Sequence, residues 1–269
     1  MSYYPIIDGD VLVYRCGFAA QYNVYQCLEC NENFRYKKDL MAHEHADINC
    51  QVNTVVEPVG YALNNVKTTM VAILERLEAK DYIVYLSGDT NFRDEIAKTK
   101  KYKGNRDKYR KPAWYDEIRT YLINTWKAEV VNGIEADDAV ADALDEEHKC
   151  IVSIDKDLNQ IAGWHYNWVK DELYNVEPFE AQRCFWLQMI MGDVTDNIQG
   201  IPGYGPKKAE KYLDMFDPHE WEQAVMELYE NEYGVLGAAN VFPEHYNLIK
   251  IGGVDERINN LEMGSTEGD

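Results

Sequence analysis

The sequence predicts an α/β fold in which helices cover both faces of a parallel sheet. Short apolar runs that are typical of buried strands alternate along the first 160 residues with segments of helical periodicity. Strands buried on both faces read as continuous apolar runs, which favours a parallel sheet over an antiparallel one. The chain has 269 residues, enough for one large domain or two modest ones with a sizeable core.

Four apolar runs are the expected strands. They lie at Ile6-Ile7, 82–86, 127–131 and 150–154. Residues 57–80 have apolar side chains three and four positions apart and end in lysine, so a helix is predicted there. Residues 11–20 suit either a helix or a strand, a further helix is expected to begin near Glu135, and a helix or turn is expected at 156–158.

Residues 21–54 are predicted to be an insertion that binds one structural zinc ion. Cys27 and Cys30 are two positions apart, His43 follows after a twelve-residue spacer, and the spacer contains Phe34 and Leu40. This spacing is typical of a zinc finger, in which metal binding replaces a core that so short a segment cannot build. Cys50 is the expected fourth ligand and His45 is its competitor. The alternative is that these residues are free thiols and unrelated histidines.

Acidic residues follow each of the four expected strands. Because parallel strands end at one edge of a sheet, these carboxylates are expected to meet in one cleft. Their mutual repulsion would be relieved by divalent cations, and oxygen ligands suit Mg²⁺ or Mn²⁺, two of which can clamp a reacting phosphoryl group. The acids are Asp8, Asp10, Asp89, Glu135, Asp137, Asp138, Asp155 and Asp157, with Asp193 and Asp196 further along the chain.

Two features point to nucleic acid in spite of an overall net charge of −20. Residues 98–111 contain eight basic residues and one acid, a local net charge of +7, with Tyr102 and Tyr109 between them. This combination is typical of a site for single-stranded nucleic acid. The stretch 192–209 has glycines at 200, 203 and 205 followed by lysines at 207 and 208, a loop that can offer backbone N–H groups to a phosphate.

No apolar run is long enough for a membrane helix, and the N-terminus lacks the basic start and apolar stretch of a secretory signal. We therefore expect a cytoplasmic protein that does not bind membranes. The six cysteines are then expected to be free or metal-bound rather than paired in disulfides.

Six blocks of the sequence resemble the flap endonuclease and 5′→3′ exonuclease family, most of all its bacteriophage branch. They are IIDGD at 6–10, NFR at 91–93, YKGNR at 102–106, GIEADD at 133–138, SIDKDLNQ at 153–160 and GDVTDNIQGIPGYGPKKA at 192–209. The resemblance implies a PIN-like nuclease domain over 1–185 with a helical arch at 94–125. It also implies a helix–three-turn–helix DNA-binding region within 186–269.

The resemblance also assigns roles to residues. Metal ligands or their supporting carboxylates would be Asp8, Glu135, Asp137, Asp138, Asp155, Asp157, Asp193 and Asp196. Lys103 and Arg106 would contact the scissile phosphate, Tyr102 would stack on a base, and Arg93 would hold the 5′ side. Asp8, Asp138, Asp155, Lys103 and Arg106 are the expected catalytic residues, and Gly203, Gly205, Lys207 and Lys208 are expected to bind DNA. Ser87 stands where the family has an aspartate, and Asp89 is the expected replacement.

The implied activity is two-metal hydrolysis of DNA at 5′ ends, flaps or nicks, in phage replication, repair or recombination, in the host cytoplasm if the chain is phage-encoded. Two alternatives remain. One is a catalytically inactive DNA-structure-binding protein of the same fold. The other is an exonuclease that removes RNA primers from RNA–DNA hybrids.

Overall fold

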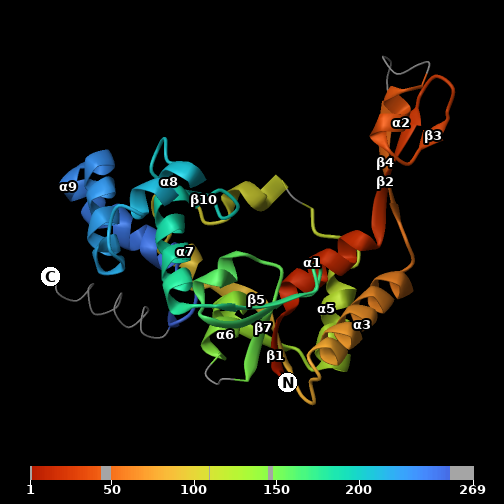
Figure 1. The fold of residues 1–269 in the computed structure, drawn as a ribbon. Coiled ribbons are helices and arrows are strands. Elements are labelled where there is room, and N and C mark those ends of the chain that lie inside the picture. Colours follow the sequence, from red (N-terminus) through yellow and green to blue (C-terminus); the bar gives the residue numbers. More distant parts are fainter. Residues whose placement is uncertain (1, 44–49, 109, 145–147, 255–269) are drawn as a thin grey trace.

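The computed structural model describes residues 2–43, 50–108, 110–144 and 148–254 (Figure 1). Its centre is a six-stranded sheet in which the first five strands are parallel and the last is antiparallel to its neighbour. The predicted α/β fold is confirmed, although the last two strands were not predicted. In spatial order the strands are β6 (Glu129–Gly133), β5 (Ile83–Asn91), β1 (Tyr4–Asp8), β7 (Lys149–Val152), β8 (Gly163–Asn167) and β9 (Glu172–Val176).

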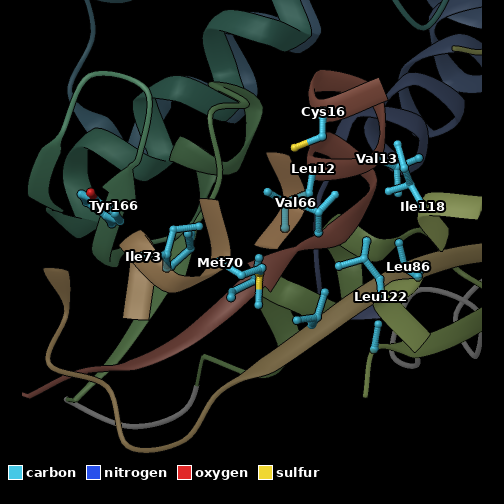
Figure 2. Close-up of a cluster of buried hydrophobic side chains, with 14 of the residues drawn as sticks. Leu12, Val13, Cys16, Val66, Met70, Ile73, Leu86, Ile118, Leu122 and Tyr166 are labelled. Carbon is cyan, nitrogen blue, oxygen red and sulfur yellow. The ribbon is translucent and has the colours of Figure 1, made fainter. Parts of the chain in front are cut away.

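Helices cover both faces of the sheet. Ile6 and Ile7 are neighbours in β1 and point to opposite faces, each into a separate buried cluster. The larger cluster, shown in Figure 2, packs the sheet against α1 (Gly9–Ala19), α3 (Val59–Arg76) and α5 (Tyr115–Trp126). The smaller one packs it against α6 (Ala136–Asp142) and the 3₁₀ helix η2 (Asp157–Gln160).

The first helix resolves the ambiguity at residues 11–20. The carboxylate of Asp8 accepts a hydrogen bond of 3.2 Å from the backbone N–H of Val11, which caps the helix. Gly9 lies so close to β5 that an added Cβ would stand 2.5 Å from the carbonyl oxygen of Tyr85. Only glycine therefore allows α1 to begin against the end of β5.

The insertion is an antiparallel ribbon with a small tip. Strands β2 (Gln21–Cys27) and β4 (Cys50–Val56) pair along their whole length, and the tip holds β3 (Asn33–Phe34) and α2 (Lys37–Met41). Figure 1 shows the ribbon rising from the end of α1 away from the sheet. The competing zinc ligand His45 lies outside the described residues.

The segment expected to be a helical arch is only partly helical where it is described. After α4 (Phe92–Ile96) the chain runs without a helix to the short 3₁₀ helix η1 (Gly104–Lys108), and α5 begins at Tyr115. Tertiary hydrogen bonds satisfy this backbone in place of helical ones. The amides of Lys98 and Thr99 donate to the Glu244 carboxylate, and the amide of Lys103 donates to the carbonyl of Asp196. Tyr109 lies outside the described residues.

The C-terminal part of the chain packs around a second core. It comprises α7 (Pro178–Met191), the two-residue strands β10 (Gly192–Asp193) and β11 (Ile198–Gln199), α8 (Pro206–Leu213), the 3₁₀ helix η3 (Pro218–Glu220) and α9 (Trp221–Ile249), which is kinked at Gly234. The predicted boundary between residues 185 and 186 falls inside α7. Phe185 and Trp186, on either side of that boundary, both belong to this second core, so a boundary there would divide one packed helix. Residues 255–269 lie outside the described residues.

Glycines make the turn between α7 and α8 possible. A Cβ on Gly200 would lie 2.0 Å from the backbone carbonyl of Met191, and one on Gly192 would lie 2.2 Å from the amide nitrogen of Gly200. The two backbones therefore touch with no room for a side chain. Within the described ranges, none of the helices has the length and apolar character needed to cross a bilayer.

Candidate active site

A cavity of about 980 Å³ lies at the carboxyl ends of the parallel strands. It is lined by acids from separate elements, by two basic side chains from the basic segment, and by Tyr14, Arg15 and Phe18 of α1. Most of the strand-end acids are thus brought together; Asp89 and Asp138 do not line the cavity. The lining acids are Asp8, Asp10, Glu135, Asp137, Asp155, Asp157 and Asp196.

Asp8 and Asp155 form the part of the cavity at the ends of β1 and β7. The Ser153 hydroxyl donates to Asp8 over 3.0 Å and accepts from the backbone amide of Asp155 over 3.0 Å. Burial, followed by the nearby charge of Asp10, raises the pKa of Asp8 to about 7. The negative charge of this carboxylate is therefore disfavoured by its surroundings, and a nearby cation would stabilise it.

The start of α6 supplies Glu135 and Asp137, which line the cavity. Burial raises the pKa of Asp137 well above its ordinary value, and the charges of Glu135 and Asp138 add to this effect. Burial alone would also raise the pKa of Glu135, but Lys103 and Arg93 outweigh it and lower the pKa. Neighbouring carboxylates are thus pushed to different protonation states.

Asp138 and Arg93 are placed differently from the expectation. The Asp138 side chain is fully buried, accepts from the amide of Glu135 over 3.2 Å, and makes a two-pronged ion pair with the guanidinium of Arg93, one contact of which is 2.8 Å. Arg93 is 1% exposed and also donates to the carbonyls of Leu248 (3.0 Å) and Lys250 (2.8 Å). Arg93 is thus too deeply buried to hold the 5′ side of a nucleic acid, which corrects that expectation, and Asp138 supports the start of α6 without lining the cavity.

A second group of carboxylates lies between η2 and the turn after α7. Asp157, Asp193 and Asp196 line a small recess beside the main cavity together with Glu135 and Asp137. Burial raises the pKa of Asp157 to about 7, and the charges of Asp155, Asp193 and Asp196 add to this effect. The side chain of Gln188 on α7 donates to Asp157, and Asp193 accepts from the amides of Thr195 and Asp196.

Lys103 and Arg106 lie against these acids. The Lys103 ammonium pairs with Glu135 and stands 3.9 Å from Asp196, and the Arg106 guanidinium pairs with Asp196 over 2.6 Å. Burial lowers the pKa of Lys103, but Glu135 and Asp196 outweigh it, so the pKa is raised overall. The two side chains are 26% and 44% exposed and line the cavity, as expected for groups that meet a phosphate there.

Tyr102 does not present its ring to solvent, which corrects the expectation that it stacks on a base. It is 4% exposed and belongs to the second core. Its hydroxyl lies 2.7 Å from Glu135 and 2.8 Å from Asp196. The hydroxyl has one proton, so it can donate to only one of these carboxylates at a time. Tyr102 therefore lies in the core and bridges two acids of the site.

Asp89 is the predicted acid that the structure separates from the others. It is exposed, it does not line the cavity, and its backbone amide donates to Asn132 over 3.3 Å. Ser87 lines the cavity in its place, at the point within β5 where the regular pairing with β6 is interrupted. The expectation that Asp89 replaces an acid at Ser87 is therefore not met by the geometry, because two further residues of strand carry Asp89 past the sheet edge.

Arg119 is a site residue that sequence reasoning missed. It lies on α5, pairs with Asp10 over 3.2 Å, and donates to the carbonyl of Ser87 over 2.7 Å. In the sequence, Arg119 looks like any other charged residue on the solvent-exposed face of an amphipathic helix. No sequence pattern therefore identifies it as part of the site.

The donor set fits hard divalent cations in its chemistry, because every cavity acid offers carboxylate oxygen. Within residues 2–43, 50–108, 110–144 and 148–254, however, no three of these acids bring ligand atoms within 4.8 Å of one another. Lys103, Arg106 and the Tyr102 hydroxyl stand between them.

The residues expected to bind a DNA backbone lie on the turn before α8. Gly203 adopts a left-handed conformation with φ of +78°, and Gly205 caps α8. Lys207 and Lys208 are exposed in the first turn of that helix, and the Lys208 ammonium lies 3.8 Å from the centre of the Tyr204 ring. Both charges are free to meet a ligand in solvent.

Three of the predicted zinc ligands meet at the tip of the insertion. Ligand atoms of Cys27, Cys30 and His43 lie within 4.8 Å of one another, with 3.1 Å between the Cys30 sulfur and His43 Nε2. Cys50 is the register partner of Cys27 in the ribbon but is not part of this group. The ring of Phe34 packs on His43 with 5.0 Å between centres, so the spacer aromatic supports the histidine.

No family model matches the chain. It is 32% identical to the DNA polymerase I of Bacillus caldotenax over 158 residues, which are 50% of this chain and 17% of the polymerase. It is 30% identical to a 5′-3′ exonuclease of Mycoplasmopsis pulmonis over 168 residues, 55% of each chain. The matches thus span about half or less of these relatives.

Among solved structures, the chain is similar to the bacteriophage T5 D15 flap endonuclease, crystallised as a pseudo-enzyme-product complex with DNA and metal ions. The TM-score is 0.53 at 16% identity, and the likeness covers 91% of this chain and 98% of that one. It shows that the fold is shared. The sequence relatives and this shared fold agree with the resemblance of the chain to the flap endonuclease and 5′→3′ exonuclease family.

Proposed function

We propose that the chain is a metal-dependent 5′ nuclease that hydrolyses DNA phosphodiester bonds at 5′ ends, flaps or nicks. The observation that carries the proposal is the cavity in which carboxylates from the ends of β1, β6 and β7 face Lys103 and Arg106. Acids that bind cations and bases that bind a phosphate are both required for phosphoryl transfer, and a binding protein has no use for so much buried repulsion.

Two Mg²⁺ or Mn²⁺ ions are the proposed cofactors. When bound, such ions polarise a phosphoryl oxygen and lower the pKa of a bound water. Asp8, Glu135, Asp137 and Asp155 would hold one in the main cavity, and Asp157, Asp193 and Asp196 would hold the other beside it. Asp8 and Asp155 line only the main cavity and Asp193 lines only the recess, which supports two positions; the other four acids line both hollows and lie between them.

Lys103 and Arg106 would bind the scissile phosphate in the negatively charged transition state. Both already pair with carboxylates, so both side chains reach the place where charge would develop. Lys103→Ala should lower the single-turnover rate far more than it lowers DNA affinity. Lys98→Ala is the control, because Lys98 is exposed and does not line the cavity. Equal and small effects of both changes would contradict the role.

The turn before α8 would hold the phosphate backbone of the duplex. Gly203 and Gly205 leave the backbone accessible, and Lys207 and Lys208 supply exposed charge. Each lysine-to-alanine change there should lower the slope of log K against log salt concentration by about one unit.

We also propose the division of the chain into a nuclease domain and a DNA-binding region. The two buried clusters support it, because one is built from residues before the start of α7 and the other mainly from α7 to α9. Within the nuclease domain, the basic segment reaches the cavity through Lys103 and Arg106, and the insertion begins just after Ala19, which also lines the cavity.

The zinc ion is proposed as structural. Two thiolates and an imidazole are soft donors that select zinc over the magnesium of the carboxylate site. After dialysis against EDTA the protein should retain about one zinc per chain, and Cys27→Ser should lose it. Cys184→Ser is the matched control, since Cys184 is a partly buried thiol of α7 outside the insertion. Zinc retained in full by Cys27→Ser would rule the site out.

The decisive experiment is cleavage of a 5′-flap, a nicked duplex and an RNA–DNA hybrid, each with Mg²⁺ and with EDTA. The proposal expects Mg²⁺-dependent cleavage of the DNA substrates. Tight binding without cleavage would favour the inactive DNA-structure-binding protein, and cleavage of the hybrid alone would favour the primer-removing exonuclease. A cytoplasmic location stays a prediction.

A further inference from the structure

Strand β5 brings no carboxylate of its own into the cavity. Among the described residues, β1 ends in Asp8, β6 leads into Glu135 and β7 leads into Asp155, all of which line it. β5 contributes the neutral Ser87, and its acid, Asp89, is exposed outside the cavity. One position in a row of four acids is thus neutral.

The side chain of Asp10 lies at that neutral position. It stands in the first turn of α1, and its carboxylate accepts from the backbone amide of Ser87 over 3.1 Å. The Ser87 hydroxyl accepts from the amide of Ala136 over 2.9 Å, so the serine links Asp10 to the start of α6. Gly9 permits the arrangement, because it lets α1 begin in contact with β5.

Asp10 also lines the same cavity as the other acids. Asp8, Glu135 and Asp155 line this cavity with it. A carboxylate that stabilised only the fold would not need to face this group of acids.

We propose that Asp10 supplies the carboxylate that β5 lacks, and so belongs to the divalent-cation site as a ligand or as the partner of a ligating water. The inference rests on the proposed function. In this assignment, Asp10 in the first turn of α1 takes the role that was expected of Asp89 on β5, and Asp89 is not part of the site.

The competing explanation is that Asp10 only anchors α5 through its ion pair with Arg119. The two explanations predict different effects of Asp10→Asn and Arg119→Gln on cation affinity. If Asp10 is part of the cation site, Asp10→Asn weakens cation binding, whereas Arg119→Gln leaves it unchanged or strengthens it, because Arg119 competes for the same carboxylate. If the ion pair is only structural, both changes lower stability and neither changes cation affinity.

The test is Mn²⁺ binding to the full chain, measured by calorimetry or by the paramagnetic resonance signal of free Mn²⁺, with unfolding curves for every variant. We expect Asp10→Asn to weaken binding about 10- to 100-fold, as is usual for groups that support a metal site. Asp89→Asn should bind like the unaltered protein. Unchanged affinity in Asp10→Asn, or equal losses in Asp10→Asn and Asp89→Asn or Arg119→Gln, would overturn the inference.

A swap of the two residues gives an independent test should Asp10→Asn fold poorly. Asp10→Ser combined with Ser87→Asp returns an acid to β5, where it can still accept from Ala136. The double variant should bind Mn²⁺ more tightly than Asp10→Ser alone, and equal affinities would contradict the inference. Failure of the unaltered protein to bind Mn²⁺ and to cleave DNA would instead overturn the proposed function and the inference with it.

Discussion

Replacing Arg93 should lower the stability of the protein and leave its affinity for DNA unchanged. Arg93→Met removes the partner of Asp138, a carboxylate with no exposed surface, and leaves the carbonyls of Leu248 and Lys250 without their donor. Breaking a buried ion pair from one side costs about 3–5 kcal/mol, because the remaining charge stays buried. For a chain of this size the loss corresponds to a melting temperature lower by on the order of 10 °C.

Two comparisons make this prediction sharp. Arg76→Met breaks another arginine–aspartate pair, 2.8 Å from Asp171, but its side chains are 46% and 66% exposed. That change should cost less than about 1 kcal/mol. Combining Arg93→Met with Asp138→Asn should recover part of the loss, because the buried charge is gone while the amide oxygen can still accept from Gly252.

The assay is urea denaturation of the three variants in EDTA, together with the affinity for a flap substrate at a temperature where each variant is folded. The expected result is a large loss of stability and unchanged affinity for Arg93→Met. Weaker binding with unaltered stability would refute the burial argument and return Arg93 to the DNA-binding surface.

Three further predictions follow from the geometry. In EDTA, the free energy of unfolding should fall as the pH rises from about 4 to about 7. Asp8 and Asp157 both have a folded pKa of about 7, so in this range each keeps a proton that the unfolded chain has released. Each should contribute a fall of about 1.4 kcal/mol per pH unit. Denaturation in a pH series should show a shallower slope for Asp8→Asn, and an identical slope would contradict the assignment. Tyr102→Phe should cost about 1–3 kcal/mol and leave affinity for single-stranded DNA unchanged, as measured by fluorescence anisotropy; weaker binding at unchanged stability would restore a stacking role. Gly200→Ala should lower the free energy of unfolding by about 3 kcal/mol in the same assay, because the new Cβ would overlap the backbone of Met191. Gly205→Ala is the control and should be neutral, because a Cβ there has nothing within 4 Å. Equal losses for the two variants would refute the packing argument.

The sequence predicts which acids share a cavity because parallel topology alone dictates it. Residues that follow successive parallel strands must emerge at the same edge, whatever else the chain does. Asp8, Glu135 and Asp155 are therefore found where they were expected. The short spacing also brings Cys27, Cys30 and His43 together, because residues so close in the chain have few possible arrangements. Cys50 is not in that group, and zinc binding there stays a prediction.

The errors concern charges whose partners are far away in the chain. Arg93 pairs with a residue 45 positions later and with carbonyls more than 150 positions later, and no local pattern announces such contacts. Tyr102, between lysines in the sequence, appears exposed, yet its ring packs into the core formed by α7 to α9. Tertiary burial decides whether a basic or aromatic residue meets solvent, and the local sequence does not contain that information.

Lys103 pairs with Glu135, and Arg106 pairs with Asp196. These ion pairs affect how a cation and a phosphate can bind in the cavity. Each basic side chain now neutralises an acid in a place where an unmatched charge is costly. A phosphate alone would have to draw both bases away and leave the acids unmatched, and a cation alone would leave the bases unmatched. Cation and phosphate arriving together keep every charge matched. The folded chain therefore favours binding both over binding either one, which couples the two affinities without any movement of the sheet.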